Sequence, residues 1–388
     1  MIINTSKRLG TVQEYYFSRK LREIAQLNAT GADIINLGVG SPDLHPADEV
    51  IAVLNTASQA ALSAQYQSYK GVPELRFAFA KWYRERYQVD LNPDTEILPL
   101  MGSKEGIMHL SMAFLEPGDE VLVPNPGYPT YKAAARLAGA KVLEYPLSEN
   151  GDWLPDMDFL QMFSLRRVKM MWLNYPNMPT GVPMDLERMK ELVAFAKKEK
   201  ILLCHDNPYS FILNPNPASI LSIAGAKDVA VELNSLSKSH NMAGFRVGVL
   251  AGKQAYIDAV MRFKTNMDSG MYWPIQQAAI RALELGDDWY NDLNALYKKR
   301  RELVWAIFDR LDCTYAKNRV GMFVWAGIPD QYESAEVYSD RILKESRVFI
   351  TPGSVFGSNG KRYLRISLTT GMDRLQTALE RIKNGVTL

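Results

Sequence analysis

The sequence predicts an α/β fold, with a mostly parallel seven-stranded sheet flanked by helices and a smaller α+β domain. At 388 residues the chain is long for one hydrophobic core, which favours two domains. Short apolar runs alternate with helical segments up to about residue 251, a pattern typical of parallel strands buried on both faces. After about residue 275 long helices and strands follow. We therefore expect a large domain at residues 45–285 and a small domain formed by both termini, residues 1–44 and 286–388.

The first part of the chain supplies helices and loops. An amphipathic pattern predicts a helix over residues 13–28, and a strand with a Gly-rich turn is expected over 34–43. Residues 47–64 are expected to be helical. Residues 64–87 open with an aromatic loop and continue as a helix from Pro73. The seven strands of the sheet are expected at residues 96–101, 120–124, 141–145, 168–174, 201–206, 229–235 and 247–251.

The last third of the chain has a different order of elements. A long helix is expected between about residues 275 and 310, broken near Gly286. Two strands are expected at residues 322–328 and 363–368. Helices are expected over residues 334–346 and 371–385. This alternation predicts the small α+β domain.

Composition excludes several classes of protein. A net charge of +2 gives no reason to expect nucleic acid or an anionic membrane surface as a partner. Apolar runs are too short for a membrane span, and the N-terminus lacks the apolar core of a secretion signal. The four histidines show no metal-ligand spacing, so we expect no metal site. With only two cysteines, a reduced cytoplasm fits the sequence.

Residues 233–249 carry the strongest chemical signal. Lys238 follows a run that reads as a buried strand, and burial disfavours the ammonium form of a lysine. Arg246 and the hydroxyls of Ser235 and Ser237 could hold an oxyanion. From this segment alone, a solvated loop lysine is an equally good interpretation.

Polar residues at the ends of other predicted strands favour the chemical interpretation. Asp206 and Asn174 follow apolar runs, and ligands gather at the carboxyl ends of strands in open α/β sheets. A buried carboxylate at Asp206 needs a proton or a cation, which a protonated pyridine nitrogen would supply. Ser103 would cap a helix whose free N–H groups can bind an anion, with Lys104 beside it. These needs together describe pyridoxal 5′-phosphate (PLP).

Several long motifs resemble the class I/II aminotransferases of PLP fold type I. The resemblance runs in order from about residue 15 to the C-terminus, and it is greatest to the branch with aspartate, alanine and LL-diaminopimelate aminotransferases. The motifs are YQSYKGVPELR (66–76), MGSKEGI (101–107), NYPNMPTG (174–181), DNPY (206–209), SLSKSHNMAGFRVG (235–248), RVGMFVW (319–325) and VFITPGSVFGSNGKRYLRISL (348–368).

The resemblance implies a role for each matching residue. Lys238 is expected to form the internal aldimine with PLP and then to move the Cα proton of the substrate. Asp206 is expected to pair with the pyridine nitrogen, and Tyr209 to donate to the phenolic oxygen. Arg365 is expected to bind the substrate α-carboxylate as a bidentate fork, beside Gly40 and Tyr15. The remaining expected cofactor contacts are Ser103, Lys104, Tyr128, Asn177, Ser235, Ser237, Arg246, and Tyr66 reaching across from the partner subunit of a homodimer.

One position departs from the family pattern. The family usually has asparagine directly before Pro-Thr-Gly, where it donates to the phenolic oxygen, and this chain has Met178 there. A thioether cannot donate a hydrogen bond. Either Asn177 or Asn174 makes the contact, or Tyr209 acts alone, and our hypothesis is Asn177.

The resulting functional prediction is a PLP-dependent aminotransferase that moves an amino group between an L-amino acid and a 2-oxo acid. The alternatives are a PLP lyase of the same fold, acting by β-elimination, and a PLP-binding regulator. No second arginine is evident for a dicarboxylic substrate, since Arg262 and Arg319 are expected on the surface. Aromatic side chains are expected to line the pocket, from Tyr15, Tyr16 and Trp273, and this mildly favours an apolar or long substrate.

Overall fold

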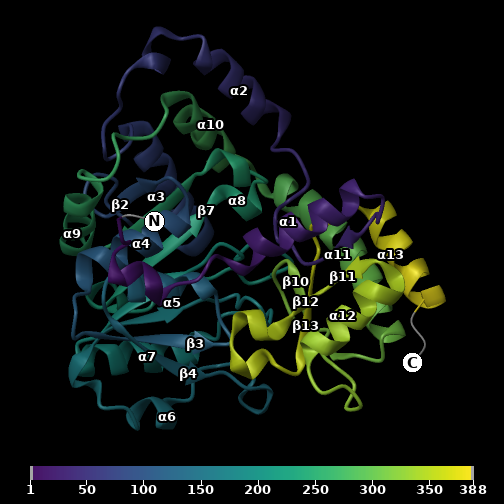
Figure 1. The fold of residues 1–388 in the computed structure, drawn as a ribbon. Coiled ribbons are helices and arrows are strands. Elements are labelled where there is room, and N and C mark those ends of the chain that lie inside the picture. The colour runs from purple at the N-terminus through teal and green to yellow at the C-terminus, as the bar shows by residue number, and fades with distance from the viewer. Residues whose placement is uncertain (1–2, 386–388) are drawn as a thin grey trace.

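The structure is a computed structural model, and it describes residues 3–385 (Figure 1). Its largest sheet has seven strands in the order β2-β8-β7-β6-β5-β3-β4. β8 is antiparallel to both of its neighbours, and the other neighbouring pairs are parallel, which confirms the predicted fold class. The strands are β2 (Ile97–Leu100), β3 (Glu120–Asn125), β4 (Lys141–Pro146), β5 (Val168–Leu173), β6 (Leu202–Asp206), β7 (Ala230–Ser235) and β8 (Gly248–Gly252).

The central strands are buried on both faces, as their apolar runs predict. In β6, Leu202 and Cys204 pack into one hydrophobic core, and Leu203 packs into the other. Successive side chains of a strand point to opposite faces, so one strand contributes side chains to both cores. Helices α4 (Ser103–Phe114), α5 (Pro129–Leu137) and α9 (Gln254–Lys264) cover the first face. Helices α3 (Pro73–Tyr87), α7 (Leu186–Glu199) and α10 (Trp273–Leu283) contribute to the second core.

A second group of elements comes from both ends of the chain. A four-stranded antiparallel sheet has the order β12-β13-β10-β9, and the short strand β1 pairs in parallel with β11. Thus a segment near residue 35 and one near 348 lie side by side. Residues 1–2 and 386–388, the outer ends of the predicted small domain, lie outside the described residues, and the predicted domain boundaries stay a prediction. The strands are β1 (Ile35–Asn36), β9 (Thr314–Tyr315), β10 (Phe323–Gly327), β11 (Val348–Phe349), β12 (Thr351–Pro352) and β13 (Tyr363–Ser367).

Long helices connect the two groups of strands. The predicted break near Gly286 is confirmed, because α10 ends at Leu283 and α11 begins at Asp287. In Figure 1, α11 runs from the large sheet toward the C-terminal elements, where it packs beside α13. No helix in the described range is long and apolar enough to cross a membrane. The remaining α-helices are α1 (Tyr16–Ala29), α2 (Asp48–Ser58), α6 (Met157–Gln161), α8 (Leu236–Ser239), α11 (Asp287–Arg310), α12 (Ala335–Ser346) and α13 (Met372–Gly385).

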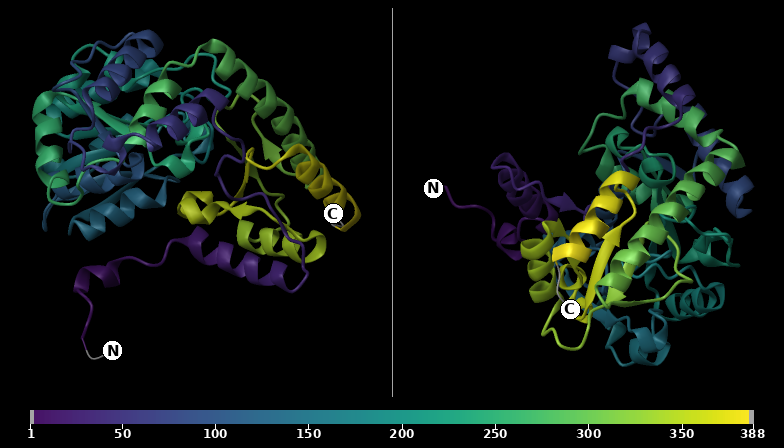
Figure 2. Two further views of the ribbon diagram at one scale, coloured as in Figure 1. Left: turned by 90° about the horizontal axis from the view of Figure 1, so that it is seen from above. Right: turned by 90° about the vertical axis from the view of Figure 1, so that its right-hand side faces the viewer.

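The N-terminal segment runs between the two groups. Its 3₁₀ turn η1 (Lys7–Thr11) lies beside α5, and α1 lies along the C-terminal elements (Figure 2). The ring of Phe17, at the start of α1, lies 6.4 Å from that of Phe356, centroid to centroid. The segment that joins η1 to α1 therefore passes the carboxyl ends of the large sheet.

Candidate active site

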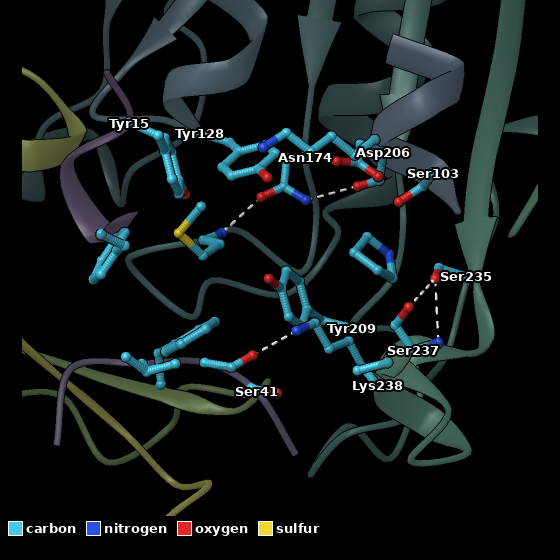
Figure 3. Close-up of a pocket in the computed structure, with 18 of the residues that line it drawn as sticks. Tyr15, Ser41, Ser103, Tyr128, Asn174, Asp206, Tyr209, Ser235, Ser237 and Lys238 are labelled. Carbon is cyan, nitrogen blue, oxygen red and sulfur yellow. Dashed lines mark hydrogen bonds between the residues drawn. The ribbon is translucent and has the colours of Figure 1, made fainter. Parts of the chain in front are cut away.

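A cavity of about 610 Å³ lies where the carboxyl ends of β5, β6 and β7 meet the N-terminal segment and the four-stranded sheet (Figure 3). The structure brings twelve of the residues predicted from sequence together around it, while Asn177 and Tyr66 do not line it. The twelve are Tyr15, Gly40, Ser103, Lys104, Tyr128, Asp206, Tyr209, Ser235, Ser237, Lys238, Arg246 and Arg365.

Lys238 lies in the short helix α8, directly after β7. Its Nζ donates a hydrogen bond to the backbone oxygen of Gly40 at 2.5 Å. Burial, with the positive charges of Arg365 and Arg246, lowers the pKa of Lys238 to about 8. About a tenth of the amine is therefore unprotonated at pH 7, far more than for a lysine with the ordinary pKa of 10.5, and the unprotonated form is the nucleophile.

Asp206 ends β6 and is 4% exposed. Its Oδ2 accepts a hydrogen bond from the hydroxyl of Tyr131 at 2.8 Å, while its buried Oδ1 has no partner among residues 3–385. Burial raises the pKa of the Asp206 carboxyl to about 6. A buried carboxylate oxygen without a donor is costly, so this position suits a ligand that brings a protonated nitrogen.

A concave site suited to an anion, which we call the cup, lies at the start of α4 and is formed around Gly102, Arg246 and Gly248. Gly102 has a φ of +88°, and a Cβ there would lie 2.2 Å from Nη2 of Arg246. A Cβ on Gly248 would lie 2.6 Å from the backbone nitrogen of Ser103. Glycine therefore lets the guanidinium and β8 approach the free N–H groups of the helix.

Two serines complete this cup. The hydroxyls of Ser235 and Ser237 lie 2.9 Å apart, and Ser237 also donates its N–H to Ser235 Oγ at 3.2 Å (Figure 3). Lys104 adds a cation whose pKa is lowered by burial and by Arg246. Hydroxyls, a guanidinium and backbone donors in one place match the needs of a phosphate group.

Arg365, on β13, is a buried cation within a cage of aromatic rings. The centre of its guanidinium lies 4.1 Å from the ring centroid of Phe323 and 4.6 Å from that of Phe356. Nη2 donates to the Gly38 oxygen at 2.5 Å, and Nη1 lies 3.3 Å from Sδ of Met178. Burial lowers the pKa of Arg365 to about 10.

The aromatic faces stabilise the charge of Arg365 without neutralising it. Its Nε has no hydrogen-bond partner within the described chain, and no carboxylate of residues 3–385 pairs with it. A planar cation with a free donor at a cavity wall is suited to bind a carboxylate of a ligand.

Comparison with known proteins gives this geometry a context. The model of the protein family "Aminotransferase class I and II" matches residues 32–382 of the chain. The chain belongs to this family. An LL-diaminopimelate aminotransferase of Dehalococcoides mccartyi is 39% identical over 379 residues, 97% of each protein. The apo structure of BacF from Bacillus subtilis superposes with a TM-score of 0.94 at 37% identity, covering 99% of this chain and 98% of that one. A mutant of Thermus thermophilus aspartate aminotransferase, 24% identical, shares the fold, with a TM-score of 0.91 over 98% of this chain and 99% of that one.

This aminotransferase depends on pyridoxal phosphate and acts on an amino acid and a 2-oxo acid. The lyase and regulator alternatives are not favoured by its relatives. The residues around the cavity fit the cofactor. Asp206 Oδ1 has no hydrogen-bond donor among residues 3–385, which fits a protonated ring nitrogen. Lys238 has a lowered pKa, which fits a reaction with an aldehyde. At Gly102 there is no room for a side chain beside Arg246, which fits a phosphate held by the backbone.

Asn177, the residue expected to contact the cofactor, does not line the cavity in this structure. The Asn177 amide is used inside its own turn, where Nδ2 donates to the Asn174 oxygen at 3.1 Å and Oδ1 accepts from Thr180. Asn174 does line the cavity, and its Nδ2 donates to the Asp206 backbone oxygen at 2.7 Å (Figure 3). Met178 also lines the cavity. The asparagine one residue before the usual family position is therefore held inside its own turn and does not face the cavity.

Other candidates lie outside the cavity. Tyr66 is 91% exposed on the loop before α3. Arg319 forms an ion pair with Asp152 at 2.5 Å, and neither Tyr16 nor Trp273 lines the cavity.

Sequence reasoning missed the aromatic wall and the partner of Asp206. Phe17, Phe323 and Phe356 line the cavity, and Tyr131 binds Asp206. The register that brings Phe323 near Arg365 is visible only in the structure, where β10 pairs with β13 so that Phe323 lies opposite Ser367, two residues from Arg365.

Proposed function

We propose that the cavity holds pyridoxal phosphate with Lys238 bound covalently to its aldehyde. Asp206 Oδ1 accepts from the pyridine nitrogen, and Arg246, Ser235, Ser237 and the N–H groups that open α4 hold the phosphate. The observation that carries this assignment is that an unpartnered buried carboxylate oxygen and a lysine of lowered pKa line one cavity.

When bound, the cofactor supplies an aldehyde that condenses with amines and a ring that stabilises negative charge. Lys238 Nζ, released when the amino group of the donor replaces it on the aldehyde, would take the proton from Cα of the donor and return a proton to Cα in the reverse half-reaction. Its lowered pKa lets the same atom act as base and as acid near neutral pH. Tyr209, whose pKa is raised by burial, stays protonated, and its O–H would donate a hydrogen bond to the cofactor.

The remaining residues orient the substrate. Arg365 binds the α-carboxylate with its free Nε and one terminal nitrogen. Glycine at position 40 lets the backbone lie close to the ring of Phe323, since a Cβ there would lie 2.6 Å from that ring. Tyr128 lies over the cofactor, and Tyr15 closes the cavity from the N-terminal segment. Asn174 replaces Asn177 as the amide at the cavity wall.

A direct test of this assignment uses absorbance and mass spectrometry. The enzyme purified with cofactor should show an absorbance band at longer wavelength than the protein's own aromatic band. Borohydride reduction should fix the cofactor mass on the peptide that contains Lys238. Lys238→Ala should lose both signals. Label on a different lysine would contradict the assignment.

For the substrate we propose an amino donor with an apolar or aromatic side chain. Phe17, Leu21, Phe323 and Phe356 supply apolar wall, and Asp206 is the one acidic side chain of the described residues that lines the cavity. With Asp206 assigned to the cofactor, this chain offers no carboxylate for a distal ammonium group.

LL-diaminopimelate is the second candidate donor, favoured by the names of relatives at 39–40% identity. Lys104, beside Tyr15 at 4.6 Å from its ring centroid, could hold a distal carboxylate. Single-turnover rates with phenylalanine, leucine, aspartate and LL-diaminopimelate, each followed by loss of the cofactor band, separate the two. A rate highest with LL-diaminopimelate would overturn the apolar proposal.

We also propose that the enzyme is a homodimer in which Tyr66 of each subunit reaches the phosphate of the other. Tyr66 is exposed, and Leu62, Met267 and Tyr272 add further exposed apolar surface. Mixing inactive Lys238→Ala and Tyr66→Ala subunits tests this, because one site of each mixed dimer would regain both residues. A monomer by analytical ultracentrifugation would contradict it.

A cytoplasmic location is also proposed. Cys204 and Cys313 are buried free thiols, which suits a reducing compartment. Fractionation of cells that make the tagged protein checks it.

A further inference from the structure

A buried cluster of charged and polar side chains lies behind the start of α4, outside the cavity. Glu105 and His109 come from α4, and Lys264 and Asp268 come from the end of α9 and the turn after it. Lys264 and His109 are 0% and 1% exposed. Glu105 Oε1 lies 3.3 Å from His109 Nε2, and Lys264 Nζ lies 2.8 Å from Asp268 Oδ1. Side chains this costly to bury point to a defined task.

Glu105 connects the cluster to the anion cup. Its Oε2 accepts a hydrogen bond from the backbone nitrogen of Met101 at 2.5 Å. Met101 comes directly before Gly102, which opens α4 and whose φ of +88° brings the backbone against Arg246. A glutamate three residues inside a helix can hold the chain that enters the helix in this way. Glu105 thus fixes the turn whose N–H groups face the cavity.

Asp268 connects the cluster to a second loop. Its Oδ1 also accepts from the backbone nitrogen of Gly270 at 2.8 Å. A Cβ on Gly270 would lie 2.6 Å from the backbone oxygen of Gln67, next to Tyr66. The turn after α9 therefore packs directly on the loop that carries Tyr66.

Metal binding is the competing interpretation of this cluster. Glu105, His109 and Asp268 offer ligand atoms within 4.8 Å of one another. However, the ammonium group of the fully buried Lys264 already pairs with the Asp268 carboxylate. A metal cation bound beside this ammonium group would be repelled by it. The hydrogen bond from Met101 N gives Glu105 Oε2 a structural role. Glu105 Oε1 and both ring nitrogens of His109 have no hydrogen-bond partner among residues 3–385, so metal analysis belongs to the test.

We propose that Glu105 is a positioning residue for the cofactor phosphate. It holds the turn Met101–Ser103, through the hydrogen bond from Met101 N to its Oε2, so that the N–H groups at the start of α4 converge on the anion. This role rests on the proposed function, because it assumes that the cup binds the phosphate of the cofactor.

The test compares the affinity of the apoenzyme for pyridoxal phosphate and for pyridoxal, which lacks the phosphate. Glu105→Ala should weaken binding of pyridoxal phosphate by about tenfold to a hundredfold, the size expected for a lost buried hydrogen bond. Pyridoxal binding should change by less than about threefold. Glu105→Gln, whose amide oxygen still accepts from Met101 N, should bind pyridoxal phosphate nearly as the unaltered enzyme does. Equal weakening of both ligands would show general damage and overturn the proposal, as would no change in either.

Controls keep the result interpretable. Glu187→Ala removes an exposed glutamate from the first turn of α7 and should leave both affinities unchanged. If Glu105→Ala does not fold, Glu105→Asp keeps the charge but is too short to reach Met101 N, and it should show the same phosphate-selective loss. Metal analysis of the purified enzyme completes the set, since a stoichiometric metal lost in Glu105→Gln would overturn the proposal. If the unaltered enzyme does not bind pyridoxal phosphate at all, the proposed function fails and not this role alone.

Discussion

The stability of the Asp206→Asn apoenzyme, relative to that of the unaltered apoenzyme, should increase as the pH rises. Burial raises the pKa of Asp206 from 3.8 to about 6, so the folded protein binds this proton more tightly than the unfolded chain does. The resulting stabilisation is complete below pH 3.8 and is lost as the pH rises through about 6, because the buried carboxylate must then ionise.

The magnitude follows from the size of the shift. A difference of roughly two pKa units corresponds to about 3 kcal/mol at 1.36 kcal/mol per unit, and about half of it develops between pH 5 and pH 8. Asp206→Asn removes the ionisation but keeps an oxygen that can accept from Tyr131. The stability gained by the variant should therefore grow by about 1.5 kcal/mol between these two pH values.

Urea unfolding of both apoenzymes at pH 5, 6, 7 and 8 measures this growth directly. Any constant cost of the new amide cancels, because only the change with pH is compared. In the presence of pyridoxal phosphate the order should reverse, since the carboxylate then has a partner that the amide cannot serve equally well. A stability difference that stays flat from pH 5 to pH 8 would refute the assignment of the raised pKa to Asp206.

Three further substitutions test other parts of the site. Arg365→Lys keeps the charge but loses the planar fork, so KM for the amino donor should rise about a hundredfold with a smaller change in kcat, in steady-state assays; an unchanged KM would contradict the carboxylate assignment. Tyr131→Phe removes a donor that lowers the pKa of Asp206, so the acid limb of cofactor binding should move to higher pH, seen by titrating cofactor affinity between pH 5 and 8; a limb in its original place would exclude the hydrogen bond as a cause. Gly102→Ala places a Cβ 2.2 Å from the Arg246 guanidinium at a φ of +88°, so cofactor affinity should fall by about tenfold or more by equilibrium dialysis, and an unchanged affinity would show that the cup can relax.

The fold was largely predictable because its strands carry local signals. The apolar runs at residues 120–124, 201–206 and 229–235 match β3, β6 and β7 to within a residue. The helix expected over residues 47–64 was only partly right, since α2 ends at Ser58 and a short 3₁₀ turn covers Ala61–Ala64. The strands β9, β11 and β12 were not predicted, because each is two residues long and too short for a pattern in sequence to reveal.

The site was predictable where one motif holds both the residue and its geometry. Lys238, Ser235 and Ser237 lie within three residues of one another on the end of β7 and α8, so their sequence order fixes their neighbourhood. Asn177 shows the limit of such reasoning. The amide type was available at positions 174 and 177, but which one faces the cavity depends on the internal hydrogen bonds of the turn.

The setting of Arg365 needed the complete fold. Its cage combines Phe323 from β10, Phe356 from a 3₁₀ turn after β12, and Phe17 from the start of α1, whose ring lies 5.4 Å from the guanidinium. Aromatic faces can enclose a buried arginine without pairing it with a carboxylate, which leaves a charged fork free for substrate. Because the Phe17 ring lies beside the guanidinium at the cavity wall, it would shield an ion pair with a bound carboxylate from water and so strengthen it. We infer that the affinity for the substrate carboxylate depends on the N-terminal segment. Phe17→Ala should therefore raise KM for the amino donor while leaving cofactor affinity unchanged, and an equal loss of both would contradict this coupling.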